Sequence, residues 1–359
     1  MRLSRLWLTD FRSYTNADIE FAPGLTALLG ANGEGKTNVM EAIGYLATLS
    51  SFRGAPNDAL VRSGAASAIL RAEGEREGRQ LLIEAELSAT GRGRVQVNKQ
   101  KLARTRDLLG ALRVSVFAPD DLELVKGGPA NRRQYLDEAL VARRPSLDSL
   151  RSDLDRILRQ RNALLKQSGG RLRPDVEATL AVWDAKLVET GEALADARSE
   201  LVDELAPALD LAYAQVAGRP VPVHTTYDAP WREQGLAGAL EAARTDELRR
   251  GVSLVGPHRD DLVILLDGLP ARTHASQGEQ RSLALALRLA AHRVVTDATG
   301  SPPILLLDDV FSELDPDRSA ALLAHLPVGQ TVLSSAAGLP PGALPDLVLR
   351  VVNATVTRG

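Results

Sequence analysis

The stretch GANGEGKT, residues 30–37, decides the fold class of this chain. It matches the pattern G-x-x-x-x-G-K-[ST] at every fixed position. An apolar segment, 24–29, precedes it, and a segment with helical spacing, 39–49, follows it. In this pattern the glycines let backbone N–H groups surround phosphate groups, and the start of the following helix adds partial positive charge. The stretch therefore predicts a strand, a phosphate-binding loop and a helix, as in P-loop proteins.

This loop provides both backbone and side-chain contacts for a nucleotide. Lys36 is expected to reach the β- and γ-phosphates of ATP, and the hydroxyl of Thr37 is expected to ligate Mg²⁺. ATP and Mg²⁺ are therefore the predicted cofactors. The predicted nucleotide contacts in the loop are Gly30, Ala31, Asn32, Gly33, Glu34, Gly35, Lys36 and Thr37.

A pair of carboxylates follows a second apolar segment, 304–307. A P-loop fold requires a strand beside the P-loop strand that ends in an acidic residue for the Mg²⁺ shell, and Asp308 fits this role. Asp309 is expected to point the other way and to polarise the attacking water, although it could instead cap the next helix. The predicted metal ligands are Thr37 and Asp308, and the predicted catalytic residues are Lys36, Asp308 and Asp309.

The composition excludes several classes of protein. The chain has 359 residues, 44% of them hydrophobic and 25% charged, which is typical of a globular protein with one large or two ordinary domains. The absence of cysteine excludes disulfides, thiolate zinc sites and a cysteine nucleophile. Because the sequence has neither a signal peptide nor a run of about 18 apolar residues, we expect a cytoplasmic protein without membrane contact.

The periodicity of apolar residues divides the chain into two folding regions. In residues 1–118 and 252–359 the apolar spacing predicts both helices and strands, including an antiparallel meander. Residues 119–251 are predominantly helical, with heptad-like runs at 147–164 and 180–201 that a Gly- and Pro-containing breaker separates. We therefore predict an α/β ATP-binding head, 1–118 with 252–359, and an inserted helical lobe, 119–251. The lobe is expected to contain an antiparallel helical hairpin with arms of three to six turns.

The charge is unevenly distributed, although its total is only −3. Residues 92–173 carry 19 Lys and Arg against 9 Asp and Glu, whereas residues 174–250 carry 7 against 15. A basic segment of this size fits a face that binds the phosphates of nucleic acid. The alternative is that the two segments attract one another within the fold.

Several motifs together resemble the ATP-binding cassette heads of the SMC class. They are the P-loop, SQGEQ at 276–280, the carboxylate pair and SELD at 312–315, in this order. Further strings resemble the RecF family of bacterial recombination mediators over essentially the whole chain. These strings are DFRSY at 10–14, FAPDDL at 117–122, KGGPANRR at 126–133, GPHRDD at 256–261, SQGEQR at 276–281 and LLDDVFSELD at 306–315.

The resemblance implies further site residues. Arg12 would lie at the adenine side of the site, together with Ser13 and Tyr14. In the SMC class two heads sandwich two ATP molecules, so the signature segment of one subunit contacts the nucleotide on the other. Without that context, a serine at position 276 would be read as a helix cap. The residues that the resemblance adds to the nucleotide site are Arg12 and Asn38 and, from the other subunit, Ser276, Gln277, Gly278 and Asp315.

The resemblance also implies a function. We expect an ATP-dependent homodimer that closes on single-stranded, gapped or duplex-junction DNA and helps to load recombinase. This activity would serve DNA repair, replication-gap processing and the SOS response to DNA damage, with RecR and RecO as implied partners. Weak, DNA-stimulated ATP hydrolysis would release the clamp. On charge and motif position, the expected DNA contacts are Lys126, Arg132 and Arg133.

Some positions depart from the family pattern, and two alternative functions stay open. Asp10 and Glu279 stand where Asn and Gln are common, no Gln follows the segment 112–117, and Ser334 with Ser335 stands where transporters carry a switch histidine. Hydrolysis is therefore expected to be slow. The ATPase subunit of a membrane importer, the first alternative, would carry that Gln and that His. A protein that binds ATP without hydrolysing it, the second alternative, would share every motif and differ only in rate.

Overall fold

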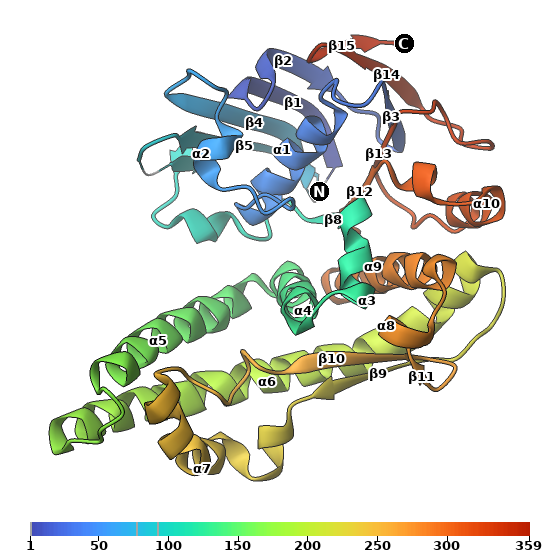
Figure 1. The fold of residues 1–359 in the computed structure, drawn as a ribbon. Helices are drawn as coiled ribbons and strands as arrows, with labels where there is room; N and C mark the ends of the chain where they lie inside the picture. Colours follow the sequence, from blue (N-terminus) through green and yellow to red (C-terminus); the bar gives the residue numbers. More distant parts are fainter. Residues whose placement is uncertain (1, 77, 92) are drawn as a thin grey trace. The chain divides into compact units, whose positions relative to one another are not determined.

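The computed structural model describes residues 2–76, 78–91 and 93–359, and the chain forms two compact units (Figure 1). One unit, which we call the head, contains residues 1–122, 208–221 and 276–359. The other unit, which we call the lobe, contains residues 123–207 and 222–275. The sequence predicts that the second segment of the head begins at residue 252. In the structure residues 222–275 belong to the lobe, where strand 223–228 pairs with strand 261–266.

A six-stranded antiparallel sheet forms one layer of the head, in the order β2-β1-β4-β5-β6-β7. Leu6 and Leu8 of β1 lie opposite Ala72 and Leu70 of β4, and all four side chains are buried on one face of the sheet. The antiparallel meander predicted from alternating residues is confirmed by the order of β4 to β7. The strands are β1 (Arg2–Phe11), β2 (Tyr14–Glu20), β4 (Ser67–Arg76), β5 (Arg79–Ser88), β6 (Arg94–Val97) and β7 (Gln100–Lys101).

A second six-stranded sheet has the order β15-β14-β3-β13-β12-β8 and is parallel except for the β14–β15 pair. Every residue of β12 and β13 is buried, as expected for inner strands of a parallel sheet that is covered on both faces. The prediction that β12 lies directly beside the P-loop strand β3 is wrong, because β13 pairs with both and lies between them. The strands are β3 (Leu25–Leu29), β8 (Val114–Phe117), β12 (Ile304–Asp308), β13 (Thr331–Ser335), β14 (Leu347–Val352) and β15 (Thr355–Arg358).

Helices and short turns of the head complete its core. Ile43 of the first helix packs in one buried cluster with Leu6, Leu306 and Val332, so residues from both sheets share this core. The helices are α1 (Lys36–Thr48), α2 (Asn57–Leu60), α9 (Gln277–Thr299) and α10 (Pro316–Ala324), with 3-10 turns η1 (Thr105–Leu108), η2 (Pro119–Leu122) and η5 (Val310–Glu313). Within the part of the chain that the structure describes, no helix combines the length and apolar character needed to cross a bilayer.

The lobe is mainly helical and contains the predicted antiparallel hairpin, formed by α5 and α6 (Figure 1). The arm lengths differ from the prediction, because α6 has 44 residues and continues through Pro207 into the part of the chain that folds with the head. The helices are α3 (Glu123–Lys126), α4 (Pro129–Arg143), α5 (Asp148–Gln167), α6 (Pro174–Ala217), α7 (Gly235–Arg250) and α8 (Ala271–His274), with 3-10 turns η3 (Pro145–Leu147) and η4 (Pro230–Glu233). A three-stranded antiparallel sheet joins β9 (Val223–Asp228), β10 (Asp261–Leu266) and β11 (Leu269–Pro270).

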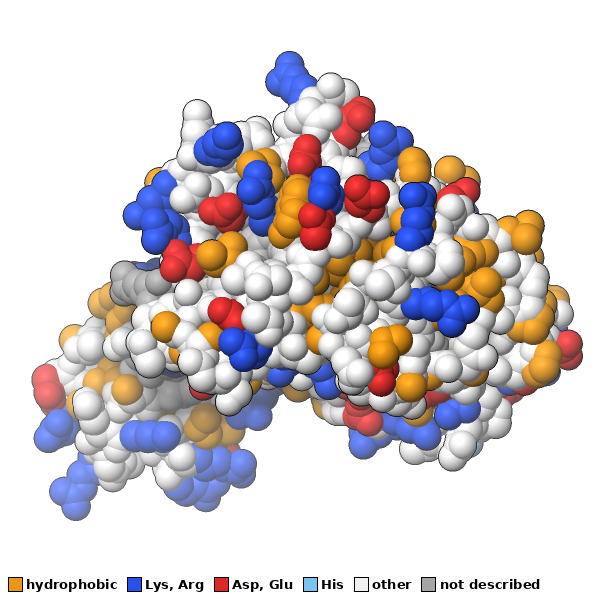
Figure 2. All heavy atoms as spheres, turned by 90° about the horizontal axis from the view of Figure 1, so that it is seen from above, with side chains coloured by type: hydrophobic (Ala, Val, Ile, Leu, Met, Phe, Trp, Pro, Cys, Tyr) orange, Lys and Arg blue, Asp and Glu red, His pale blue; other side chains and the backbone are white. Residues whose placement is uncertain are grey.

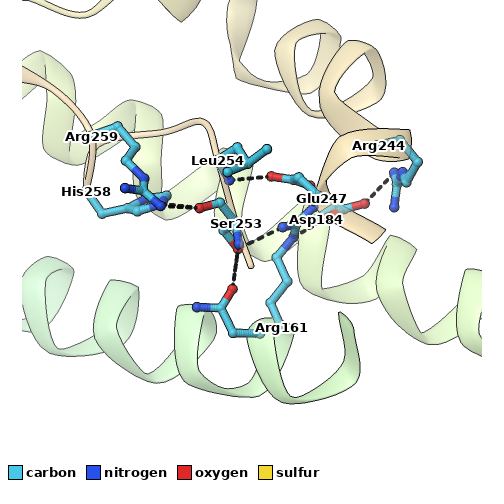
Figure 3. Close-up of polar contacts among 9 residues, drawn as sticks. Arg161, Asp184, Arg244, Glu247, Ser253, Leu254, His258 and Arg259 are labelled. Atoms are coloured by element: carbon cyan, nitrogen blue, oxygen red, sulfur yellow. Dashed lines mark hydrogen bonds and ion pairs between the residues drawn. The ribbon is translucent and has the colours of Figure 1, made fainter. Parts of the chain in front are cut away.

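A buried ionic cluster ties three helices of the lobe together (Figure 3). Arg161 of α5 is fully buried and donates to Asp184 of α6 at 2.7 Å, to Glu247 of α7 at 2.5 Å and to the Ser253 hydroxyl at 2.8 Å. Arg244 adds an ion pair to Asp184 at 2.6 Å. Removing one partner of such a cluster typically costs about 3–5 kcal/mol, because a buried charge is left without its counterpart. The attraction that the sequence suggested between the basic and acidic segments is therefore built into the lobe.

Candidate active site

The P-loop joins β3 to α1 and places two of its glycines in conformations that other residues rarely adopt. Gly33 and Gly35 have φ angles of 87° and 113°. A Cβ atom at Gly35 would lie 2.9 Å from the Tyr14 hydroxyl, and one at Gly30 would lie 2.2 Å from the Val351 carbonyl oxygen of β14. The loop is therefore enclosed by β1–β2 on one side and by β14 on the other, and it has no room for larger residues at these positions.

Lys36 is the first residue of α1, and its ammonium group turns back into the loop. Its Nζ donates to the carbonyl oxygens of Gly30 at 2.7 Å and Ala31 at 2.8 Å, and the residue is only 5% exposed. A cation at the centre of a ring of backbone amides is the arrangement that binds phosphate in P-loop proteins. Asn32 is exposed, and Glu34 is half-buried, with its carboxylate accepting from the backbone N–H of Asn353.

The P-loop and the carboxylate pair are joined by one hydrogen bond. The Thr37 hydroxyl donates to Asp308 Oδ1 at 3.0 Å, and the Ser334 hydroxyl donates to the same oxygen at 2.7 Å. Burial raises the pKa of Asp308, while the hydrogen bonds from Ser334 and Thr37 act in the opposite direction. Hydroxyl and carboxylate oxygens are ligands that Mg²⁺ prefers, and it is commonly held by one or two carboxylates together with substrate phosphates. Thr37 and Asp308 therefore fit a magnesium ion bound with ATP.

Asp309 occupies a strained position immediately after β12. Its φ angle is 51°, in the left-handed region, and its backbone N–H donates to the Ser334 hydroxyl at 3.0 Å. Asp309 precedes η5 as its N-cap, but its side chain makes no capping hydrogen bond there. Its carboxylate instead accepts from the Ala336 N–H at 3.4 Å. The side chain is therefore available for a role other than capping η5.

Ser334 is the site residue whose role the sequence did not reveal. The sequence marked it only as standing at the position of a switch histidine, yet it is fully buried and contacts both members of the carboxylate pair. The signal that could have identified it is a serine at the end of an inner strand, where a buried hydroxyl must find polar partners.

The turn between β1 and β2 lies against the P-loop helix. Arg12, with a φ angle of 51°, makes two hydrogen bonds to the fully buried Glu41 of α1, at 2.7 Å and 2.8 Å. Asn38 of the same helix donates to the Ser13 hydroxyl at 2.9 Å. The structure thus brings the predicted residues Arg12 and Asn38 to the same end of α1 as the P-loop.

The segment 276–280 forms the start of α9. Ser276 caps this helix, and its hydroxyl and backbone exchange hydrogen bonds with Glu279 in a capping box. These bonds to Ser276 lower the pKa of Glu279, which also pairs with Arg219 at 2.6 Å. The Glu that departs from the family pattern is therefore accommodated by local contacts.

The start of α9 packs against the start of α10. A Cβ atom at Gly278 would lie 2.8 Å from Nη1 of Arg318, whose guanidinium is held by Asp315 at 2.6 Å. Asp315 also caps α10 by accepting from the Arg318 N–H at 2.9 Å. The hydrogen bonds described for Ser276 and Asp315 stay within these two helix starts and do not reach residues 30–38 of the same chain.

One of the three predicted DNA contacts needs correction. Arg132 is 6% exposed and makes two hydrogen bonds to Asp261, at 2.7 Å and 2.8 Å, so its charge is already neutralised. Arg133 donates to the Asp260 carbonyl oxygen at 2.7 Å, and burial lowers its pKa. Arg132 is thus bonded inside the lobe and its choice as a DNA contact is wrong, whereas a DNA contact at Arg133 stays a prediction. Lys126, at the end of α3, is half-buried.

Comparison with known proteins gives consistent results. Residues 2–331 match the model of the family described as RecF/RecN/SMC N-terminal domain. A Frankia alni protein named DNA replication and repair protein RecF is 45% identical over 354 residues, covering 94% of this chain and 93% of that protein. A Streptomyces avermitilis protein of the same name is 43% identical over 375 residues, covering all of both chains.

Solved structures agree with these sequence relatives. A structure described as the recombination mediator protein RecF with ATP, in the RecFOR pathway, has a TM-score of 0.91 and 28% identity, and the match covers 100% of this chain and 97% of that one. An SMC head bound to the C-terminal winged-helix domain of ScpA has a TM-score of 0.59 and 16% identity, covering 100% and 97% of the two chains. The second likeness concerns the fold alone.

Proposed function

The chain belongs to the RecF/RecN/SMC N-terminal domain family, and from this premise we propose that it is an ATP-binding protein of DNA replication and repair that acts as a recombination mediator. The observation that carries the proposal is the 3.0 Å hydrogen bond between Thr37 and Asp308, which joins the two halves of a nucleotide site across 271 positions of sequence. The RecF name of its relatives and the RecF–ATP structure support the same assignment.

Different residues of the head act on different parts of the ATP molecule. Lys36 binds the β- and γ-phosphates, and the N–H groups of the P-loop surround them. Mg²⁺, held by Thr37 and Asp308, would neutralise charge on the phosphates. Asp309 orients a water molecule toward the γ-phosphorus. The water oxygen forms a bond to that phosphorus and gives up a proton to the Asp309 carboxylate, the bond from phosphorus to the β–γ bridging oxygen breaks, and ADP and inorganic phosphate leave.

The ATP site is completed by a second copy of the chain. Ser276 and Gly278 stand at the start of a 23-residue helix, where N–H groups and the helix dipole favour a phosphate. Because their described contacts do not reach the P-loop of the same chain, the proposal assigns them to the ATP bound by the partner. Two heads would then close around two ATP molecules and hold DNA.

Partners and cellular role follow from the family. DNA with single-stranded, gapped or junction structure is the proposed substrate, and RecR and RecO are the proposed protein partners in loading recombinase. Hydrolysis is expected to be weak, because Ser334 stands where transporters use a histidine. DNA is expected to stimulate it. The cytoplasm is the proposed location.

The proposal is tested by ATP-dependent dimerisation of the full chain. Sedimentation velocity with and without ATP, and with and without a gapped duplex, should show a dimer that requires ATP and becomes more stable with DNA. Lys36→Met should abolish both ATP binding and the dimer, because the fixed cation beside the phosphates is lost. Undiminished binding of a fluorescent ATP analogue by Lys36→Met would contradict the assignment of the P-loop.

A further inference from the structure

The β6–β7 turn, β7 and the segment that leads into η1 carry four basic side chains without acidic partners. From Gly93 to Arg106 the sequence contains no Asp or Glu. Four exposed cations follow one another closely here, and among the described side chains none of them forms an ion pair. We call this set the basic edge, and it consists of Lys99, Lys101, Arg104 and Arg106.

Several other cations of the same basic segment are neutralised within the fold. In the lobe, Arg132 pairs with Asp261 at 2.7 Å and Arg143 pairs with Glu204 at 2.7 Å. In the upper part of the face in Figure 2, basic and acidic side chains lie interspersed. At the hairpin itself, Arg94 pairs with Glu86 at 2.9 Å, and Asp107 is engaged by the Arg104 backbone N–H. The basic edge therefore places four uncompensated cations within the eight residues 99–106 of the head.

The basic edge is held in a fixed position. Two residues, Asn98 and Lys99, connect β6 to β7 with φ angles of 49° and 65°, as in the tight hairpin turn that usually carries Asn-Gly. Asn98 exchanges two hydrogen bonds with Leu82 of β5, at 2.8 Å and 2.9 Å, which anchor the turn to the sheet. Lys99 thus occupies a left-handed position that favours glycine, and this strain points to a use for its charge.

We propose that the basic edge of the head binds the phosphate backbone of DNA. This inference rests on the proposed DNA-binding function and gives it a location. Unpaired Lys and Arg side chains bind phosphates of any base sequence, and each contact releases condensed counterions. A lipid surface fits less well, because no large exposed hydrophobic side chain lies among the described residues of this segment.

Charge removal in the full chain tests the proposal. The test variant replaces Lys99, Lys101, Arg104 and Arg106 by Gln, and the matched control replaces four exposed cations of the lobe by Gln, namely Arg144, Arg159, Lys166 and Arg171. Binding of a labelled 30-base-pair duplex is measured by anisotropy with ATP at several salt concentrations. We expect the test variant to lose at least about tenfold in affinity, and its log–log salt slope to fall by about 0.9 per lost phosphate contact.

The outcomes distinguish a failure of the basic edge from a failure of the proposed function. Parental affinity and slope in the test variant would overturn the basic edge and leave the proposed function intact, and so would an equal loss in the control. A parent chain that binds ATP but no DNA would contradict the proposed function itself. Binding of the fluorescent ATP analogue should be equal in all three proteins, since no changed residue lies in the nucleotide site.

A single substitution gives a second, independent readout. Lys99→Gly relieves the left-handed strain and removes one cation, so the melting temperature should rise by about 1–3 °C while DNA affinity falls. Because a merely structural Lys99 would give the stabilisation alone, an unchanged DNA affinity and salt slope in this variant would count against the proposal.

Discussion

The Ser334 hydroxyl joins both acidic residues of the active site, donating to Asp308 at 2.7 Å and accepting from the Asp309 N–H at 3.0 Å. Ser334→Ala should lower the rate of ATP hydrolysis by about 10–100-fold, since a hydrogen bond to a charged group contributes about 1.5–3 kcal/mol. ATP binding should change little, because the P-loop contacts remain. Ser334→Thr should restore the rate, and Ser335→Ala, on the same buried strand, is the matched control. Equal rates for Ser334→Ala and the parent would remove Ser334 from the site.

A variant of Asp309 can distinguish a protein that hydrolyses ATP from one that only binds it. Asp309→Asn keeps the shape of the side chain but removes the charge that orients water, so it should bind ATP, form the dimer and hydrolyse about 10²–10⁴-fold more slowly. Single-turnover hydrolysis and sedimentation together measure both properties. Turnover at the parental rate would show that Asp309 only occupies the cap position of η5.

Motif residues could be placed from sequence because their contacts are local, whereas their distant partners could not. Lys36 bonds within its own loop, five and six positions away. Ser334 lies 25 positions from Asp309, and Arg132 lies 129 positions from Asp261. Burial and pairing across such separations depend on which strands become neighbours. A short sequence motif contains no information about strand neighbours.

The start of α9 is the element on which the composite site depends. Ser276→Arg should leave ATP binding to the P-loop nearly unchanged and block the ATP-dependent dimer, because the bulky cation stands where the partner's phosphate would bind. Mixed with Lys36→Met chains, it should recover part of the dimer, since one of the two sites then combines an intact P-loop with an intact signature. The measurement is ATP-dependent dimerisation of each variant and of the mixture. Normal dimerisation by Ser276→Arg alone would return Ser276 to a helix cap.

Helix lengths and strand order were the elements that the sequence predicted least well. The heptad run ends at Leu201, and Pro207 resembles a stop, yet α6 continues to Ala217. It does so because Leu209, Tyr213 and Val216 carry the apolar spacing onward in a shifted register and are buried. Similarly, the position of β13 between β3 and β12 depends on pairing between segments, which apolar patterns do not specify.

Each unit of the molecule contains a neutral histidine that is shielded from water, half-buried in the lobe and buried in the head, and this makes folding sensitive to mild acid. His258 of the lobe contacts the Ser253 carbonyl oxygen at 3.1 Å, and His292 of α9 contacts the Ser115 hydroxyl at 3.0 Å. Burial lowers the pKa of each to about 4, from an ordinary value of 6.5. Below pH 6.5 the unfolded chain binds protons that the folded chain does not, so each histidine makes folding less favourable as the pH falls toward 4.

His258→Gln should therefore flatten the pH dependence of stability, because the side chain no longer takes up a proton on unfolding. By pH 5 the parent should have lost about 2 kcal/mol through His258, relative to pH 7, and the variant should not show this loss. The measurement is the difference in unfolding free energy between parent and variant from pH 7 to pH 5. Carboxylates such as Asp260, whose pKa burial raises, act in the opposite sense, but they are present in both proteins and cancel in that difference. Parallel curves for the two proteins would mean that His258 is protonated as readily in the folded lobe as in the unfolded chain.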